Sequence, residues 1–74
     1  MANDVSKNSR IILIGSKIRE KRISKGWTMM DLAFEAEVDY RQLGRIERGE
    51  NNFTINSILK ITDALGCHLR DVIK

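Results

Sequence analysis

Apolar positions recur at intervals of three and four along most of the chain, the spacing that brings side chains to one face of an α-helix. The first such stretch places four side chains within about 80° of one another around a helix: Ile11, Ile14, Ile18 and Arg22. Gly26 suits the left-handed position that commonly follows the end of a helix. The pattern predicts a first helix over about 9–25, and the arginine on its buried stripe needs a partner.

A second helix is predicted from residue 29 to about residue 36. Thr28 is a good N-cap, and Asp31 three residues later comes close to a capping box. The expected inward face consists of Leu32, Ala33 and Ala36. Because only Glu37 and Val38 separate this helix from the next N-cap, a tight turn should follow.

The third helix, predicted over about 40–48, has two unlike faces. Asp39 is its N-cap, and Gln42 completes a second capping box. Leu43 and Ile46 should point to the core. The opposite face, spanning about 60°, carries Arg41, Arg45 and Arg48. Two short helices joined by about three or four residues are typical of a helix-turn-helix.

Two more helices are predicted before the chain ends. The fourth is capped by Thr54, ends at Gly66, and is expected to bury Ile55, Ile58, Leu59, Thr62 and Leu65. The last, about 69–73, presents Leu69, Val72 and Ile73 at helical spacing. No segment shows strand alternation. The sequence thus predicts a compact all-α, five-helix domain over residues 9–74, with a flexible segment at residues 1–8.

Composition narrows the possible classes of protein. A chain of 74 residues with 42% hydrophobic and 31% charged residues fits one folded, soluble domain. The apolar run at residues 11–14 is far too short to span a bilayer, and residues 1–10 lack the layout of a signal peptide. The single cysteine, Cys67, excludes an internal disulfide. We therefore expect a cytoplasmic protein with no membrane association.

The sequence offers little catalytic or ligand chemistry. With one histidine and one cysteine, no metal site is expected. There is no nucleophile–base pair and no phosphate-binding glycine loop, so we expect no cofactor and no enzymatic activity. A chain of this length also has no room for a domain that would bind a small-molecule effector.

Charge is more informative by its placement than by its total of +3. Arginine on the third helix suits base recognition, because its planar fork can bond guanine O6 and N7 together. A solvated charged surface is the alternative. Gly44 lies among these arginines and costs a helix about 1 kcal/mol relative to Ala. Close approach to DNA or tight packing against the second helix would each explain it.

The stretch at residues 28–49, TMMDLAFEAEVDYRQLGRIERG, resembles the helix-turn-helix of the XRE family, which includes the lambda-type repressors and Cro. The resemblance covers roughly residues 12–74, and LGRIERG with DLA upstream is its most specific part. It implies a lambda repressor-like fold and a sequence-specific transcriptional regulator that binds double-stranded DNA. Restriction–modification controllers are members of matching size, and small phage or plasmid regulators fit equally.

The resemblance also implies roles for matching positions. Base contacts are expected from Tyr40, Arg41 and Arg45. Contacts with the DNA backbone are expected from Thr28, Met29, Gln42, Arg48, Asn51 and Asn52. Arg22 and Glu47 should form a structural ion pair between the first and third helices.

Some positions depart from the family pattern. Met29 stands where the family usually has a DNA-contacting Gln, and methionine cannot donate that hydrogen bond. Glu37 replaces the usual turn Gly, so the turn should be strained or differently shaped. Trp27 replaces an aliphatic residue and is expected to anchor the core, with base stacking as the alternative.

A homodimer is expected, because one helix reads too few base pairs to define a site in a genome. Two-fold symmetry would supply a second half-site about one helical turn away. The expected interface consists of Ile61, Leu65, Leu69, Val72 and Ile73, with Ile12 and Leu13 as second choice. The alternative function is an antitoxin-type module whose main role is to bind a partner protein.

Overall fold

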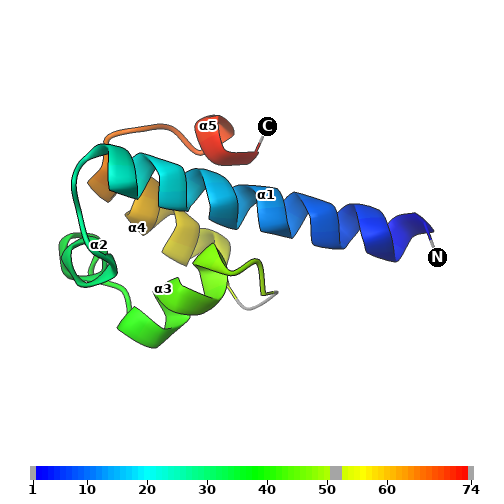
Figure 1. Cartoon of the computed structure of the whole chain (residues 1–74), viewed down its shortest axis with the longest axis horizontal. Coiled ribbons are helices and arrows are strands. Elements are labelled where there is room, and N and C mark those ends of the chain that lie inside the picture. The colour runs from blue at the N-terminus through cyan, green and yellow to red at the C-terminus, as the bar shows by residue number, and fades with distance from the viewer. Residues whose placement is uncertain (1, 51–52, 74) are drawn as a thin grey trace.

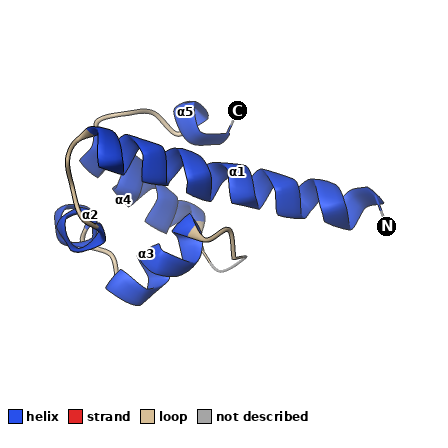
Figure 2. Ribbon diagram, viewed as in Figure 1, coloured by secondary structure: helices blue, strands red, loops and turns tan. Residues whose placement is uncertain are grey.

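The computed structural model describes residues 2–50 and 53–73, which form five helices and no strand (Figures 1 and 2). The helices are α1 (Ala2–Ser24), α2 (Met29–Ala36), α3 (Tyr40–Glu47), α4 (Ile55–Leu65) and α5 (Arg70–Ile73). The predicted all-α architecture is therefore confirmed. The long α1 contacts α3, α4 and α5, while α2 packs against α3 and α4 (Figure 1). No helix in this part of the chain is long and apolar enough to cross a membrane.

The first helix begins at Ala2, well before the predicted start at Ser9. Residues 2–8 are mostly polar, but they contain neither Gly nor Pro, so none of them interrupts the backbone hydrogen bonds of a helix. In Figure 1 the N-terminal turns of α1 extend beyond the other helices. The division of the chain into a segment at 1–8 and a domain at 9–74 stays a prediction.

The start of α2 has the predicted cap. The backbone N–H of Asp31 donates to Thr28 Oγ1 (3.1 Å), and the N–H of Thr28 donates to Asp31 Oδ2 (2.8 Å), which completes a capping box. The second capping box is only half formed. Asp39 Oδ2 accepts from the N–H of Gln42 (3.1 Å), but Gln42 Nε2 donates to Ser57 Oγ on α4 (3.1 Å) instead of returning to Asp39. A partner on a neighbouring helix has replaced the local one.

All five helices contribute to one hydrophobic core. Its buried members are Ile14, Ile18, Leu32, Ala33, Ala36, Leu43, Ile46, Ile58, Ile61, Leu65 and Val72. The predicted inward face of α4 was wrong in part, because Ile55 and Leu59 are exposed and Ile61 is fully buried. Both α1 and α2 cover α4, so the side chains that face these two helices form its buried side.

This burial corrects the predicted dimer interface. Ile61, Leu65 and Val72 lie within the core of the single subunit and leave no surface for a second one. Ile61 and Leu65 are buried because α1 and α2 pack on α4, and Val72 is buried because α5 packs on α1. Leu69 is partly buried against the same core, and Ile73 remains exposed.

Candidate nucleic-acid interface

The turn between α2 and α3 has the left-handed residue that the sequence indicated. Glu37 has φ 56° and ψ 44°, and its N–H bonds to carbonyls of the last turn of α2. The N–H of Val38 donates to the carbonyl of Ala33 (3.1 Å), which closes the end of the helix. Since a side chain is disfavoured in this conformation, the turn is maintained at a cost in backbone strain.

The arginine-bearing face of α3 is exposed, as expected. Arg41 and Arg45 project from the side of α3 opposite the fully buried Leu43 and Ile46, and Tyr40 at the start of the helix is also exposed. Among the side chains that the structure describes, neither arginine forms an ion pair. Their guanidinium donors are therefore available to another molecule.

A shallow hollow of about 380 Å³ lies along this face. It is lined by Met29, Tyr40, Arg41, Gly44, Arg45 and Arg48. A Cβ at Gly44 would lie 3.3 Å from Met29 Cε and 3.1 Å from Arg48 Nη1. Both atoms are ends of flexible side chains that can move aside, so packing alone does not require glycine at this position.

Arg48, at the C-cap of α3, has a partner that the sequence analysis missed. Its Nε lies 3.0 Å from Glu50 Oε2, and the two side chains are 63% and 51% exposed. Exposed pairs of this kind are worth about 0–1 kcal/mol. Arg48 could therefore exchange Glu50 for a phosphate at little cost.

Arg22 and Glu47 lie in direct contact. Arg22 Nε is 2.8 Å from Glu47 Oε2 and Nη2 is 3.0 Å from Oε1, while Nη1 donates to the carbonyl of Trp27 (2.8 Å). The guanidinium group thus links α1 to the end of α3 and to the loop that leads into α2. Trp27 itself is partly buried and packs against the core.

The other residues expected to contact the DNA backbone differ in their exposure. Thr28 is exposed and Met29 is half-buried, both at the start of α2. Gln42 is half-buried and bonded to Ser57. Asn51 and Asn52 lie outside the described residues.

Arg19 on α1 belongs to the same region, although the sequence analysis did not assign it a role. A second, smaller hollow is lined by Arg19, Arg22, Met29, Gly44, Glu47 and Arg48. Arg19 is exposed and lies one turn before Arg22. The i, i+3 spacing of the two arginines was the available signal, because it places them on one side of the helix.

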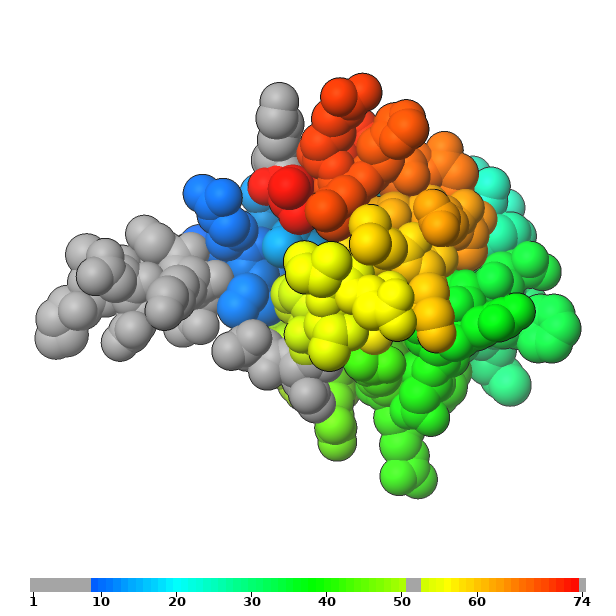
Figure 3. Space-filling model, turned by 180° about the vertical axis from the view of Figure 1, so that it is seen from behind, coloured from blue at the N-terminus to red at the C-terminus, as the bar shows by residue number. Residues whose placement is uncertain are grey.

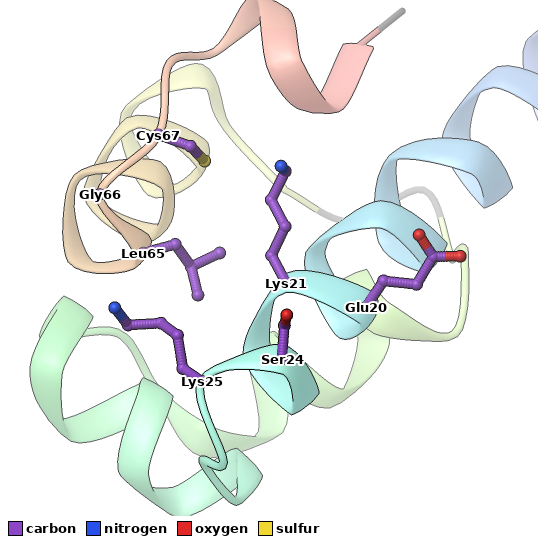
Figure 4. A pocket seen from close by; sticks show the side chains of 7 residues that line it. All are labelled: Glu20, Lys21, Ser24, Lys25, Leu65, Gly66 and Cys67. Carbon is purple, nitrogen blue, oxygen red and sulfur yellow. The ribbon is translucent and has the colours of Figure 1, made fainter.

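The opposite side of α1 carries a further hollow, shown in Figure 4. Glu20, Lys21, Ser24, Lys25, Leu65, Gly66 and Cys67 line it. Burial raises the pKa of the Cys67 thiol, an effect that the positive charge of Lys21 partly offsets. The thiol is therefore protonated at neutral pH and a poor nucleophile, which fits a small packing residue.

Comparisons with known proteins agree with this geometry. A family model described as helix-turn-helix matches residues 18–72. The control protein C.BamHI of Bacillus amyloliquefaciens is 36% identical over 67 residues, which cover 89% of this chain and 83% of that protein. The crystal structure of the restriction-modification controller protein C.AhdI from Aeromonas hydrophila superposes with a TM-score of 0.81 at 33% identity, over 86% of this chain and 97% of that one. The chain therefore belongs to the helix-turn-helix family, of the XRE type, and resembles its small restriction–modification controller proteins.

Proposed function

We propose that this protein is a sequence-specific DNA-binding regulator of transcription that inserts α3 into the major groove. The observation that carries the proposal is the exposed arginine face of α3, with Arg41 and Arg45 unpaired among the described side chains. A major groove about 12 Å wide accepts a helix of this kind, and the N-terminal residues of the helix then meet the base edges. Tyr40, Arg41 and Arg45 are the proposed base-contacting residues.

The similarity to controller proteins narrows the biological role. Both named relatives are control proteins, and this chain spans most of the length of each. We infer that it regulates transcription in a restriction–modification system, with a small phage or plasmid regulator as the nearest variant of the same activity. Such a regulator acts where its operator lies, in the cytoplasm, and needs no cofactor or small-molecule effector.

We also infer a homodimer, and we propose for it a different interface from the one expected from the sequence. The proposed face consists of five exposed large apolar side chains on α1, α4 and α5, namely Ile12, Leu13, Ile55, Leu59 and Ile73, and a further one on α1, Ile23, lies outside it. Figure 3 shows the segments that carry these five bordering one another on one face of the molecule. A cluster of exposed apolar residues on a small protein commonly marks an interface. None of the five lies on α3, so pairing through this face would leave both recognition helices free.

A second candidate function has one observation in its favour. Met30 and Phe34, one turn apart on α2, are 70% and 80% exposed and lie on a different helix from the proposed dimer face. An antitoxin-type module that binds a partner protein would use such a pair. Antitoxins of this fold can also bind DNA, so selection of duplexes from a random DNA pool tests the first function and a co-purifying partner protein is the test of the second. A regulator enriches a defined sequence, whereas a module without base-specific contacts enriches none.

The selected duplex then allows the base contacts to be tested. Arg41→Ala and Arg45→Ala should each weaken binding to it by about 1–3 kcal/mol and relax the preference at particular base pairs. Arg70→Ala is the matched control, because it removes the same charge from α5, away from the recognition face. If Arg41→Ala and Arg45→Ala behave like the control, α3 is not the recognition helix.

A further inference from the structure

We propose that Arg19 on α1 is a further DNA-binding residue, which contacts a backbone phosphate next to the one bound by Arg48. This inference rests on the proposed function and extends the DNA surface from the recognition helix onto the first helix. The DNA contacts expected from the sequence do not include this residue. The contact would be electrostatic and would read no base.

Arg19 lies close to the proposed DNA-binding face of α3. Its side chain lines the small hollow that it shares with Arg48, Met29 and Gly44, at the junction of α1, α2 and α3. Arg48 also lines the hollow along the recognition face. The two hollows share Met29, Gly44 and Arg48, so Arg19 lies at the margin of the surface that would face DNA.

The side chains around this hollow carry a net positive charge. Glu47 is the one acidic side chain that lines it, and both of its carboxylate oxygens accept bonds from Arg22. That pair is neutral in sum. Arg19 is exposed and forms no ion pair among the described side chains, and Arg48 is held only by an exposed contact with Glu50. The rim of the hollow is therefore positive, as a site for a phosphate group requires.

Met29 cannot donate a hydrogen bond to a phosphate in this hollow. The side chain of Met29 lines the hollow, with Cε close to Gly44, and its thioether offers no hydrogen-bond donor. A phosphate placed there needs donors from neighbouring residues. Arg19 and Arg48 both line the hollow, and the guanidinium group of each can donate to one of two neighbouring phosphates; such charge-assisted bonds are stronger than those of a neutral amide.

The helix on which Arg19 lies favours a phosphate over a base. In a helix-turn-helix the recognition helix enters the groove, and the other helices remain at the level of the sugar–phosphate backbone. Arg19 belongs to α1 and neighbours Arg48 at the C-terminal end of α3, whereas bases are met at the N-terminal end. The proposed contact should thus be indifferent to sequence.

The test is a salt titration of DNA binding with the full-length protein. Each phosphate contact contributes about 0.9 to the slope of log K against log salt concentration. Arg19→Gln should lower the slope by about one unit, weaken binding to selected and unrelated duplexes by a similar factor, and leave the base preference unchanged. Arg19→Lys keeps the charge and should restore most of the slope. Arg70→Gln, a matched neutralisation on α5, should change neither quantity.

The outcomes separate this inference from the proposed function. If Arg19→Gln retains the parental slope while Arg48→Gln lowers it, the assignment of Arg19 is overturned and DNA binding stands. If Arg19→Gln alters the base preference, the phosphate contact is overturned as well. If the unaltered protein binds duplex DNA without salt dependence or sequence preference, the proposed function fails first. Because Arg19 is exposed, its variants should unfold at the parental temperature, and this is measured alongside.

Discussion

The guanidinium group of Arg22 and the carboxylate of Glu47 form a two-bond ion pair across the contact between α1 and α3, at 2.8 and 3.0 Å. The side chains are 11% and 5% exposed, so water reaches them little. The remaining donor of Arg22 bonds to the carbonyl of Trp27. One side chain therefore links α3 to α1 and to the loop that leads into α2.

Breaking this pair should be costly. Removal of one partner from a buried pair leaves the other charge uncompensated and commonly costs about 3–5 kcal/mol. Glu47→Gln and Arg22→Met should each lower the free energy of unfolding by roughly that amount, with strong coupling in a double-mutant cycle measured by urea denaturation. The pair of Arg48 and Glu50 is the control, because both side chains are largely exposed and its coupling should be about 0–1 kcal/mol. Equal coupling in the two cycles would contradict a structural role for Arg22 and Glu47.

Two helical glycines should respond in opposite ways to alanine. A Cβ at Gly15 on α1 would collide with the carbonyl oxygen of Ile46 and lie 3.0 Å from that of Glu47, and backbone cannot move aside easily. Gly15→Ala should therefore lower the free energy of unfolding by about 1–3 kcal/mol, even though alanine favours helix. Gly44→Ala meets only the flexible ends of Met29 and Arg48, so the gain in helix propensity of up to about 1 kcal/mol should leave stability unchanged or higher.

The stability of both glycine variants is measured by thermal unfolding. For Gly44→Ala, the affinity for the selected duplex is measured as well. If Gly44→Ala is stable but binds the selected duplex more weakly, close approach to DNA contributes to the choice of glycine. An equally stable Gly15→Ala variant would show that α1 can shift away from α3, contrary to the close contact seen here.

The left-handed Glu37 offers a stabilising substitution. Glu37→Gly removes the side-chain strain of this conformation at some cost in chain entropy, so the free energy of unfolding should rise by up to about 1 kcal/mol. Glu35→Gly is the matched control, because it replaces the same residue type within α2 and should lower stability by about 0.5–1 kcal/mol. A decrease for both variants in chemical denaturation would contradict the argument from strain.

The features that sequence analysis predicted well depend on local contacts. The cap formed by Thr28 and Asp31 and the ends of helices at Gly26 and Gly66 involve residues a few positions apart, so their side chains and backbone preferences suffice to predict them. The arginine face of α3 follows from helical spacing alone. The XRE motif adds the partner of Arg22, which spacing could not identify.

The features that it missed depend on tertiary packing. Ile55 and Ile61 both fit a helical stripe on α4, and only the positions of α1 and α2 decide that Ile61 is the buried one. Gln42 has a local cap partner, yet bonds to Ser57 on another helix. Arg19 gains its significance from a neighbour on α3 that is distant in sequence. The error in the dimer face has the same origin as the error in α4.

The revised dimer face leads to the last prediction. The unaltered protein should sediment as a dimer at micromolar concentration without DNA, because the five large apolar side chains of this face would otherwise remain in contact with water. Leu59→Ser places a hydroxyl at the centre of α4 on this face and should yield a folded monomer. Leu59 is 41% exposed, so the substitution should lower the free energy of unfolding of the subunit by about 1 kcal/mol, in addition to the effect of dimer dissociation.

Phe34→Ser is the control for this prediction. Phe34 is more exposed than Leu59, but it lies on α2 and outside the proposed face, so its variant should remain a dimer. The Leu59→Ser monomer should also bind a selected duplex with two half-sites more weakly than the dimer does. The dimer binds both half-sites at once, whereas two monomers bind them in separate steps. A Leu59→Ser dimer together with a Phe34→Ser monomer would move the interface to α2. An unaltered protein that is monomeric and binds as a lone subunit would overturn the homodimer itself.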